Sequence, residues 1–185
     1  TERVAEAVQK LPEPADIVVN LQGDAPLTPP WFITALIDEM KGDSTVEMAT
    51  PVLRCDGLTL NMFREDRRNG RVGGTTVVFD QNWDALYFSK EVLPFTDKTY
   101  ADDEQTPVYH HVGAYAYRPT SLARYIRWPE RSLERLEGLE QLRLLEHGVK
   151  IRCVLVDAQG RVFWELNNPV DVARIEKVLQ TKGWP

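Results

Sequence analysis

An acidic residue follows a short apolar run near the start of the chain. Ile17 to Leu21 is almost unbroken apolar and rich in β-branched residues, and it ends in Gln22-Gly23-Asp24. Such a run predicts a strand buried on both faces of a parallel sheet, and ligands of open α/β sheets bind at the carboxyl ends of strands. A carboxylate there suits Mg²⁺, which takes oxygen ligands and shares them with substrate phosphates. An ordinary turn explains Asp24 equally well, because Gly-Asp pairs are common in turns.

A second group of polar side chains lies on a predicted strand over residues 108–117. Strand alternation puts His111 and Tyr115 on the same face, two positions apart. Both side chains offer hydrogen bonds from a rigid ring, so this face can line a polar pocket. A half-exposed strand facing solvent is the alternative, and the pattern favours neither.

A third group lies on a helix predicted over Ser132 to His147, closed by Gly148. At about 100° per residue, one sector of this helix mixes leucines with acids: Leu133, Leu136, Leu144, Glu137 and Glu140, with Gln141 at its margin. Carboxylates on an apolar face destabilise the fold unless they are paired with a cation or take part in binding a ligand. Arg143, three residues after Glu140, could neutralise it as a surface ion pair.

The elements that must position these groups alternate between helices and strands. A first helix should end near Lys10 before Pro12, and a second should begin at Thr28-Pro29. The remaining predicted elements are a strand at 46–53, a charged loop or short helix at 56–74, a hairpin of Thr75–Phe79 with Ala85–Ser89, a helix at 121–128, a strand at 150–157 and a helix opening at Asn168-Pro169.

Composition narrows the class of protein. The 185 residues carry a net charge of −6 with scattered basic residues, which argues against a nucleic-acid partner. No apolar run is long enough to predict a membrane span. Cys55 and Cys153 have no metal or disulfide spacing, so we expect two reduced thiols in the cytoplasm. The length predicts one domain over residues 1–185. Because Thr1 leads directly into a helix, we expect the chain to lack the amino-terminal part of its fold.

Three blocks of sequence resemble the sugar-acid cytidylyltransferases, and among them the 3-deoxy-manno-octulosonate (Kdo) cytidylyltransferase family. The blocks are Val18 to Leu27, Ala85 to Lys90, and His111 to Arg118 continuing into Leu133 to Arg143. Gln-Gly-Asp alone is a weak signal of the family. The segment His111 to Arg118, followed by Leu133 to Arg143, is specific to it. The resemblance extends in order from Thr1 almost to the end.

The resemblance implies an α/β, Rossmann-like nucleotidyltransferase fold with a mixed, mostly parallel sheet flanked by helices and a small β-hairpin subregion. It also implies an enzyme that uses Mg²⁺ to join CTP and a 2-keto sugar acid into a CMP-sugar and pyrophosphate, usually as a homodimer, for lipopolysaccharide or capsule synthesis. By match to the motifs, Asp24 would hold Mg²⁺, Gln22 and Gly23 would lie beside substrate, and the sugar-acid pocket would be formed by His111, Tyr115, Glu137, Glu140 and Gln141.

The chain also departs from the family pattern. The expected triphosphate-binding segment is absent from the sequence as given. Asn167 stands where the family has the second metal-binding aspartate, so Asn167 or Glu165 would complete the metal site, and Lys90 stands where arginine is common. A non-catalytic sugar-binding homologue and a cytidylyltransferase for a sialic-type acid are therefore the alternatives.

Overall fold

The computed structural model describes residues 1–182. The helices are α1 (Glu2–Gln9), α2 (Pro30–Gly42), α3 (Gly57–Arg68), α4 (Pro119–Tyr125), α5 (Ser132–Glu137), α6 (Leu142–Glu146) and α7 (Pro169–Lys182). The strands are β1 (Val18–Leu21), β2 (Met48–Asp56), β3 (Thr75–Phe79), β4 (Ala85–Ser89), β5 (Gln105–His111), β6 (Ala114–Tyr117) and β7 (Ile151–Val156). None of the helices in this part of the chain is long and apolar enough to cross a membrane.

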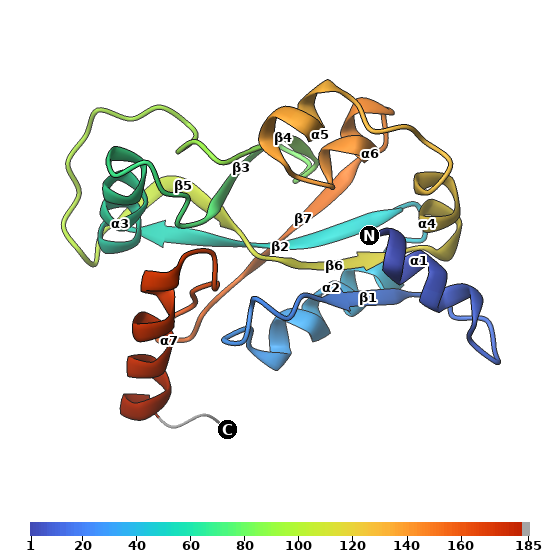
Figure 1. Cartoon of the computed structure of the whole chain (residues 1–185), viewed down its shortest axis with the longest axis horizontal. Coiled ribbons are helices and arrows are strands. Elements are labelled where there is room, and N and C mark those ends of the chain that lie inside the picture. Colours follow the sequence, from blue (N-terminus) through green and yellow to red (C-terminus); the bar gives the residue numbers. More distant parts are fainter. Residues whose placement is uncertain (183–185) are drawn as a thin grey trace.

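The seven strands form one sheet, and most of its pairs are antiparallel (Figure 1). The order is β1-β6-β2-β5-β3-β4, and β7 also pairs with β2. Between the described strands only β2 and β7 are parallel. The α/β class is therefore confirmed, but the prediction of a mostly parallel sheet is wrong. Apolar runs indicate where strands form, while partner and direction depend on contacts far apart in the sequence.

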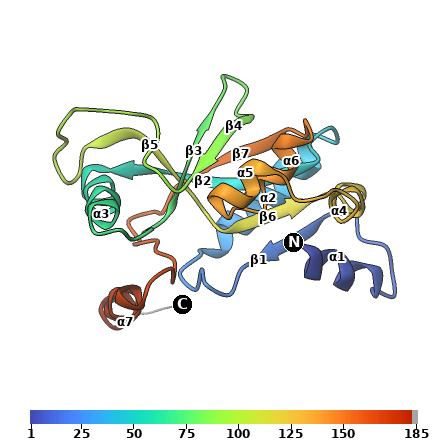
Figure 2. The ribbon, with the colours of Figure 1, turned by 45° about the horizontal axis from the view of Figure 1, so that its top comes forward.

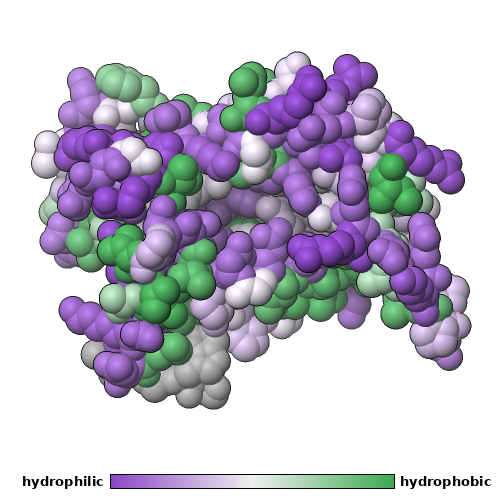
Figure 3. All heavy atoms as spheres, in the orientation of Figure 1, coloured by the Kyte–Doolittle hydropathy of each residue, from purple (hydrophilic) through white to green (hydrophobic). Residues whose placement is uncertain are grey.

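Strand β1 is not the doubly covered parallel strand that its apolar run predicted. It pairs antiparallel with β6, in register from Val18 with Tyr117 to Leu21 with Ala114, and this is its one pairing in the described sheet. Its first three side chains are half-buried, and Leu21 is 50% exposed. Apolar side chains accordingly gather along the lower edge of the face in Figure 3, where Figure 1 places β1.

The predicted hairpin of β3 and β4 is confirmed, with Thr76 opposite Ser89, and it projects from the body of the sheet (Figure 2). The single strand predicted over 108–117 is instead two strands. A tight turn, in which Ala114 N–H donates to the Val112 carbonyl at 2.7 Å, separates β5 from β6. Both strands then pair with β2, so His111 ends one strand and Tyr115 lies near the start of the next.

The long helix predicted over 132–147 is also wrong, because the chain breaks at Gly138. Gly138 has a left-handed φ of 62°, and its N–H donates to the Glu134 carbonyl at 2.7 Å, which ends α5. The helical sector of leucines and acids therefore does not exist, and Leu136 is 82% exposed. Arg143 pairs with buried Glu134 rather than with Glu140.

The charged segment after β2 forms a regular helix, α3, as one of its two predicted alternatives. The Asp56 carboxylate caps it by accepting a hydrogen bond from Thr59 N–H at 2.8 Å. Its charges are not all solvated, since Asp66 is fully buried and bonded to Arg71 at 2.8 Å. This ion pair therefore holds part of the charged segment inside the fold.

Two apolar layers hold the sheet that carries the site. Helix α2 packs Phe32, Leu36 and Met40 against β2, β6 and β7 on one side. On the other side, α1, α4 and α6 cover a cluster that includes Tyr117 and Leu142 (Figure 2). The loops at the ends of β1, β4 and β5 emerge between these layers, and the candidate site lies there.

Candidate functional site

A cavity of about 250 Å³ lies where six parts of the chain converge. Its walls come from the end of β1, the loop before β3, the end of β4, the β5–β6 turn, the α5–α6 break and the loop before α7. The lining residues are Gln22, Asp24, Val72, Thr75, Lys90, His111, Gly113, Tyr115, Gly138, Leu139, Glu165 and Asn167.

The structure brings five of the predicted residues to this cavity: Gln22, Asp24, His111, Tyr115 and Asn167. Gly23 does not line it, and a Cβ added there would meet no atom within 4 Å. Thr75 and Val72 could not be singled out from the sequence, because neither belongs to a motif. Lys90 stood out only as a departure from a family pattern, although its place directly after a strand was a usable signal.

Glu137 lies beneath the cavity wall rather than in it. Its Oε1 accepts a hydrogen bond from Ser89 Oγ at 2.7 Å, and its Oε2 accepts one from Lys90 N at 2.9 Å. The carboxylate therefore fixes the end of β4, from which the half-buried Lys90 side chain enters the cavity. Lys90 Nζ lies 2.9 Å from the position that a Cβ on Gly138 would occupy.

Glu140 and Gln141 both lie in the break between α5 and α6, and they have different surroundings. Gln141 is buried behind Tyr115, whose hydroxyl lies 3.5 Å from Gln141 Oε1. Glu140 lies outside the cavity, with a half-exposed side chain that pairs with the amino group of Thr1. The helical-wheel argument had put both residues in one wall, and it fails because the helix is not continuous.

Two carboxylates meet in the cavity. Leu166 N–H donates to the Asp24 carbonyl at 2.7 Å, which brings the loop of Glu165 against the end of β1. Glu165 is buried, and its Oε1 accepts a hydrogen bond from Gly113 N–H at 2.7 Å. Partial burial raises the pKa of Asp24, and the negative charge of Glu165 raises it further. Each acid therefore makes the negative charge of the other less favourable.

Neighbouring groups keep Glu165 ionised despite its burial. Burial alone would raise the pKa of Glu165, but His110, His111 and the Gly113 N–H outweigh it and lower that pKa. His110 Nε2 lies 3.7 Å from Glu165 Oε2, which is an electrostatic contact longer than a hydrogen bond. The cavity thus holds a buried carboxylate with one oxygen that no strong donor occupies.

His111 lines the cavity and carries a buried ring nitrogen without a partner among the described residues. The residue is 3% exposed, and no atom of residues 1–182 bonds its Nε2. Burial lowers the pKa of His111 to about 4, so the imidazole is neutral at pH 7. A neutral ring can donate from one nitrogen and accept at the other, which suits a polyhydroxylated ligand.

We expect this burial to make folding stability depend on pH. The folded-state pKa of about 4 lies below the ordinary value of about 6.5, so the unfolded chain binds the His111 proton first as pH falls. Stability is fully present above about pH 6.5, and about 2 kcal/mol of it is lost by about pH 5. Urea unfolding at pH 7.5 and pH 5 measures this loss in wild type and in His111→Phe.

Between pH 7.5 and pH 5, the free energy of unfolding of His111→Phe should fall by about 2 kcal/mol less than that of wild type. His147→Gln is the matched control, because His147 is only half-buried and stacks on Trp128. An identical pH dependence in wild type and His111→Phe would contradict the assignment of a neutral buried His111.

Asp171 at the start of α7 holds the loop that carries Glu165 and Asn167. It is fully buried, and its two oxygens accept hydrogen bonds from Trp164 Nε1 and Asn168 N, each at 2.7 Å. Asn168 Nδ2 also donates to the Val72 carbonyl at 2.7 Å. The loop is therefore tied both to its own helix and to the segment before β3.

The donor set fits a hard divalent cation that shares its coordination with a ligand. Among residues 1–182 there is no cluster of three or more histidine, cysteine or acidic side chains able to hold a metal. The cavity does collect two carboxylates and the Asn167 amide. Mg²⁺ is commonly bound by one or two carboxylates together with substrate phosphates, so these residues match Mg²⁺ better than a metal that needs a complete protein cage.

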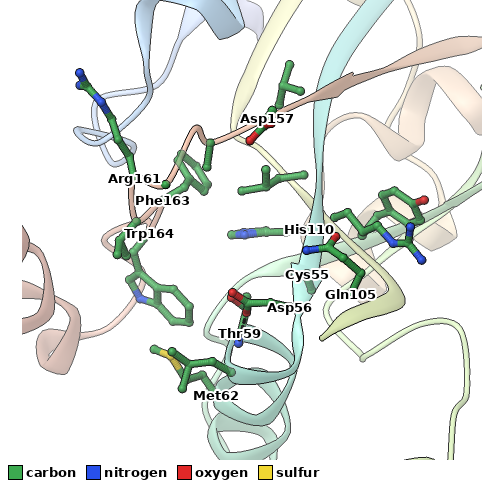
Figure 4. Close-up of a pocket in the computed structure, with 18 of the residues that line it drawn as sticks. Cys55, Asp56, Thr59, Met62, Gln105, His110, Asp157, Arg161, Phe163 and Trp164 are labelled. Carbon is green, nitrogen blue, oxygen red and sulfur yellow. Dashed lines mark hydrogen bonds between the residues drawn. The ribbon is translucent and has the colours of Figure 1, made fainter. Parts of the chain in front are cut away.

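A larger cavity, of about 730 Å³, lies beside α3 (Figure 4). None of the predicted site residues lines it, and its walls include Cys55, Met62, Phe163 and Trp164. His110 enters it between Asp157 and Asp56 in Figure 4. The volume is greater, but the predicted site residues converge at the smaller cavity, which we take as the functional site.

Comparisons with known proteins identify the family of the chain. A sequence profile described as cytidylyltransferase matches residues 1–151. The 3-deoxy-manno-octulosonate cytidylyltransferase of Maricaulis maris is 44% identical over 99% of this chain and 70% of its own length. The enzyme of the same name from Chlamydia pneumoniae is 36% identical, over 97% of this chain and 64% of its own.

Two solved structures are similar to this chain in fold. CMP:2-keto-3-deoxy-manno-octonic acid synthetase complexed with CTP superposes with a TM-score of 0.76 and 29% identity, over 98% of this chain and 68% of that one. A putative glucose-1-phosphate thymidylyltransferase from Bacillus anthracis, 13% identical with a TM-score of 0.55, shares the fold alone. The chain thus spans about two thirds of the length of the proteins that it matches.

Proposed function

The chain belongs to the cytidylyltransferase family, within the 3-deoxy-manno-octulosonate cytidylyltransferases, and from this premise we propose that the protein activates a 3-deoxy 2-keto sugar acid with CTP. The sugar acid is Kdo or a close relative, and the products are the CMP-sugar and pyrophosphate, for lipopolysaccharide or capsule synthesis. The observation that carries this proposal is one cavity that joins an acid pair, a lysine and a histidine–tyrosine face.

The reaction requires two anionic substrates to be aligned at one point. The anomeric hydroxyl oxygen attacks the α-phosphorus of CTP, the bond to the β-phosphate breaks, and pyrophosphate leaves as the hydroxyl proton is released. Mg²⁺, when bound, neutralises charge on the phosphates and acts as a Lewis acid. The remaining contribution of the protein is to orient the two substrates, because holding the reacting atoms in position lowers the activation barrier.

The residues of the cavity fit separate parts of this task. Asp24 would hold the cation together with the Asn167 amide oxygen, and Lys90 would bind the carboxylate of the sugar acid. His111 and Tyr115 would hydrogen-bond the sugar hydroxyls, and Gln22 would contribute its amide beside them. Gln141 and Glu137 would position other residues, since Gln141 contacts the Tyr115 hydroxyl and Glu137 accepts a hydrogen bond from Lys90 N.

Pyrophosphate release from CTP and Kdo with Mg²⁺ tests the function, using protein expressed from the complete reading frame. We expect release with Kdo above that with a sialic-type acid. Release with only the sialic-type acid would make that acid the substrate. No release with any 2-keto sugar acid, combined with a sugar-induced rise in Tm, would instead show a sugar-binding homologue without catalysis.

Lys90→Ala is predicted to raise KM for the sugar acid by about tenfold, with a smaller effect on KM for CTP. A partly buried charge-assisted hydrogen bond contributes about 1.5–3 kcal/mol, and each 1.4 kcal/mol corresponds to a factor of ten. Initial rates at varied sugar acid measure the change. Lys150→Ala is the control, because its amine pairs with Asp84 away from the cavity. An unchanged sugar-acid KM would remove Lys90 from substrate binding.

We also propose that the protein is a cytoplasmic homodimer. Phe95 and Leu86, near the hairpin, are 88% and 63% exposed, and apolar side chains of this size favour burial in an interface. The two free cysteines, Cys55 and Cys153, agree with a reducing compartment. Light scattering during gel filtration should give twice the chain mass.

A further inference from the structure

We propose that Glu165 supplies the second carboxylate of the divalent-cation site, opposite Asp24. This inference rests on the proposed function, because it concerns the cation that the nucleotide would share. It assigns a ligand role to a residue that lies two positions before Asn167, the residue that stands in for the expected second acid.

The geometry gives Glu165 one fixed oxygen and one available oxygen. Oε1 accepts from Gly113 N–H at 2.7 Å, which holds the side chain in place. In the described part of the chain, the polar neighbours of Oε2 are distant ones, His110 Nε2 at 3.7 Å and Asn167 Nδ2 at 3.5 Å. A carboxylate held by one oxygen and open at the other can bind a cation in monodentate fashion, with little loss of side-chain freedom.

The charge balance of the cavity also favours a cation between the acids. Asp24 and Glu165 line the same cavity, and the backbone bond from Leu166 to Asp24 keeps their loops adjacent. Neither carboxylate forms an ion pair with an arginine or lysine among the described residues. Two neighbouring carboxylates that lack a cationic partner repel each other, and a divalent cation removes that repulsion.

A second, independent feature shows that the cavity is built for a ligand. His111 lines the cavity with a side chain that is 3% exposed, and within residues 1–182 its buried Nε2 has no hydrogen-bond partner. Buried polar atoms nearly always have partners, so an orphan in the wall of a polar cavity indicates a partner supplied from outside the chain. The acid pair and His111 line the same cavity.

Asn167 alone is a poorer second ligand than Glu165. Its side chain is exposed and carries no charge, and its Nδ2 already lies near the Gly73 carbonyl and Glu165 Oε2, each at 3.5 Å. Its amide oxygen can add a neutral ligand, but the charge that balances a divalent cation must come from the acids. Asn167 is nevertheless close enough for an aspartate in its place to substitute for Glu165.

Binding of Mn²⁺ alone, followed by loss of its free electron paramagnetic resonance signal, tests this assignment. We expect Glu165→Gln to weaken Mn²⁺ affinity by at least about tenfold. Glutamine keeps an acceptor for Gly113 N–H, so thermal unfolding should show a folded protein. The double variant Glu165→Gln/Asn167→Asp restores a carboxylate nearby, so it should recover most of the Mn²⁺ affinity.

The result that would overturn the inference is Mn²⁺ affinity unchanged in Glu165→Gln but lost in Asp24→Asn. Failure of the double variant to recover affinity would also contradict it, because a carboxylate at residue 167 should replace the lost charge. Either failure leaves wild-type pyrophosphate release intact, so it is distinguishable from failure of the proposed function. Asp38→Asn, on the exposed side of α2, is the control for a general loss of negative charge.

Discussion

Replacing Asp24 by asparagine should lower kcat for pyrophosphate release by about 10³-fold. Asp24 is the acid at the mouth of the cavity, and the proposed reaction depends on a cation held there. Charge stabilisation by a bound metal contributes several kcal/mol to the transition state, and each 1.36 kcal/mol is a factor of ten in rate. Steady-state kinetics at saturating CTP and sugar acid measures the effect.

The substitution changes charge without changing size, so the fold should persist. Asp38→Asn serves as the matched control, because Asp38 is exposed on α2 and lines neither cavity. Its kcat should equal that of wild type. Activity of Asp24→Asn within a factor of about three of wild type would exclude the metal-binding role of Asp24.

The second large effect concerns stability, and it comes from a buried ion pair beside the site. Arg143 Nε and Nη2 each donate to the Glu134 carboxylate at 2.6 Å, and both side chains are at least 90% buried. Arg143 also lies over the Tyr125 ring at 4.3 Å. Glu134→Ala leaves a buried guanidinium without its partner, so we expect the free energy of unfolding to fall by about 3–5 kcal/mol.

Urea denaturation of Glu134→Ala at pH 7.5 measures this loss. Glu6→Ala is the comparison, because the Glu6–Lys10 pair is largely exposed and should contribute less than about 0.5 kcal/mol. Equal stability of the two variants would show that the Glu134–Arg143 pair does not hold α5 against α6.

Local sequence patterns correctly predicted the elements that depend on residues close together in the sequence. The β3–β4 hairpin followed from two apolar strands around a polar turn, and α1 ended before Pro12 as expected. Strand alternation also put His111 and Tyr115 on one face, and both line the cavity even though a turn at Gly113 separates their strands.

Features that depend on distant contacts could not be predicted in this way. The direction of the strands around β2 is set by partners from three other parts of the chain, so the mostly parallel sheet was wrong. The break at Gly138 arises from a left-handed backbone conformation that a helical wheel ignores. The sequence left open whether Asn167 or Glu165 completes the metal site, and the backbone bond from Leu166 to Asp24, which brings the Glu165 loop against β1, could not be predicted from it.

The most direct test of the site is a crystal structure of the protein grown with CTP, Kdo and Mn²⁺, read by the anomalous signal of the manganese. We predict a manganese peak in the smaller cavity, within coordination distance of an Asp24 oxygen and of a CTP phosphate oxygen, with the sugar acid against His111 and Tyr115. A manganese peak and nucleotide bound elsewhere, for example in the cavity beside α3, would contradict the account.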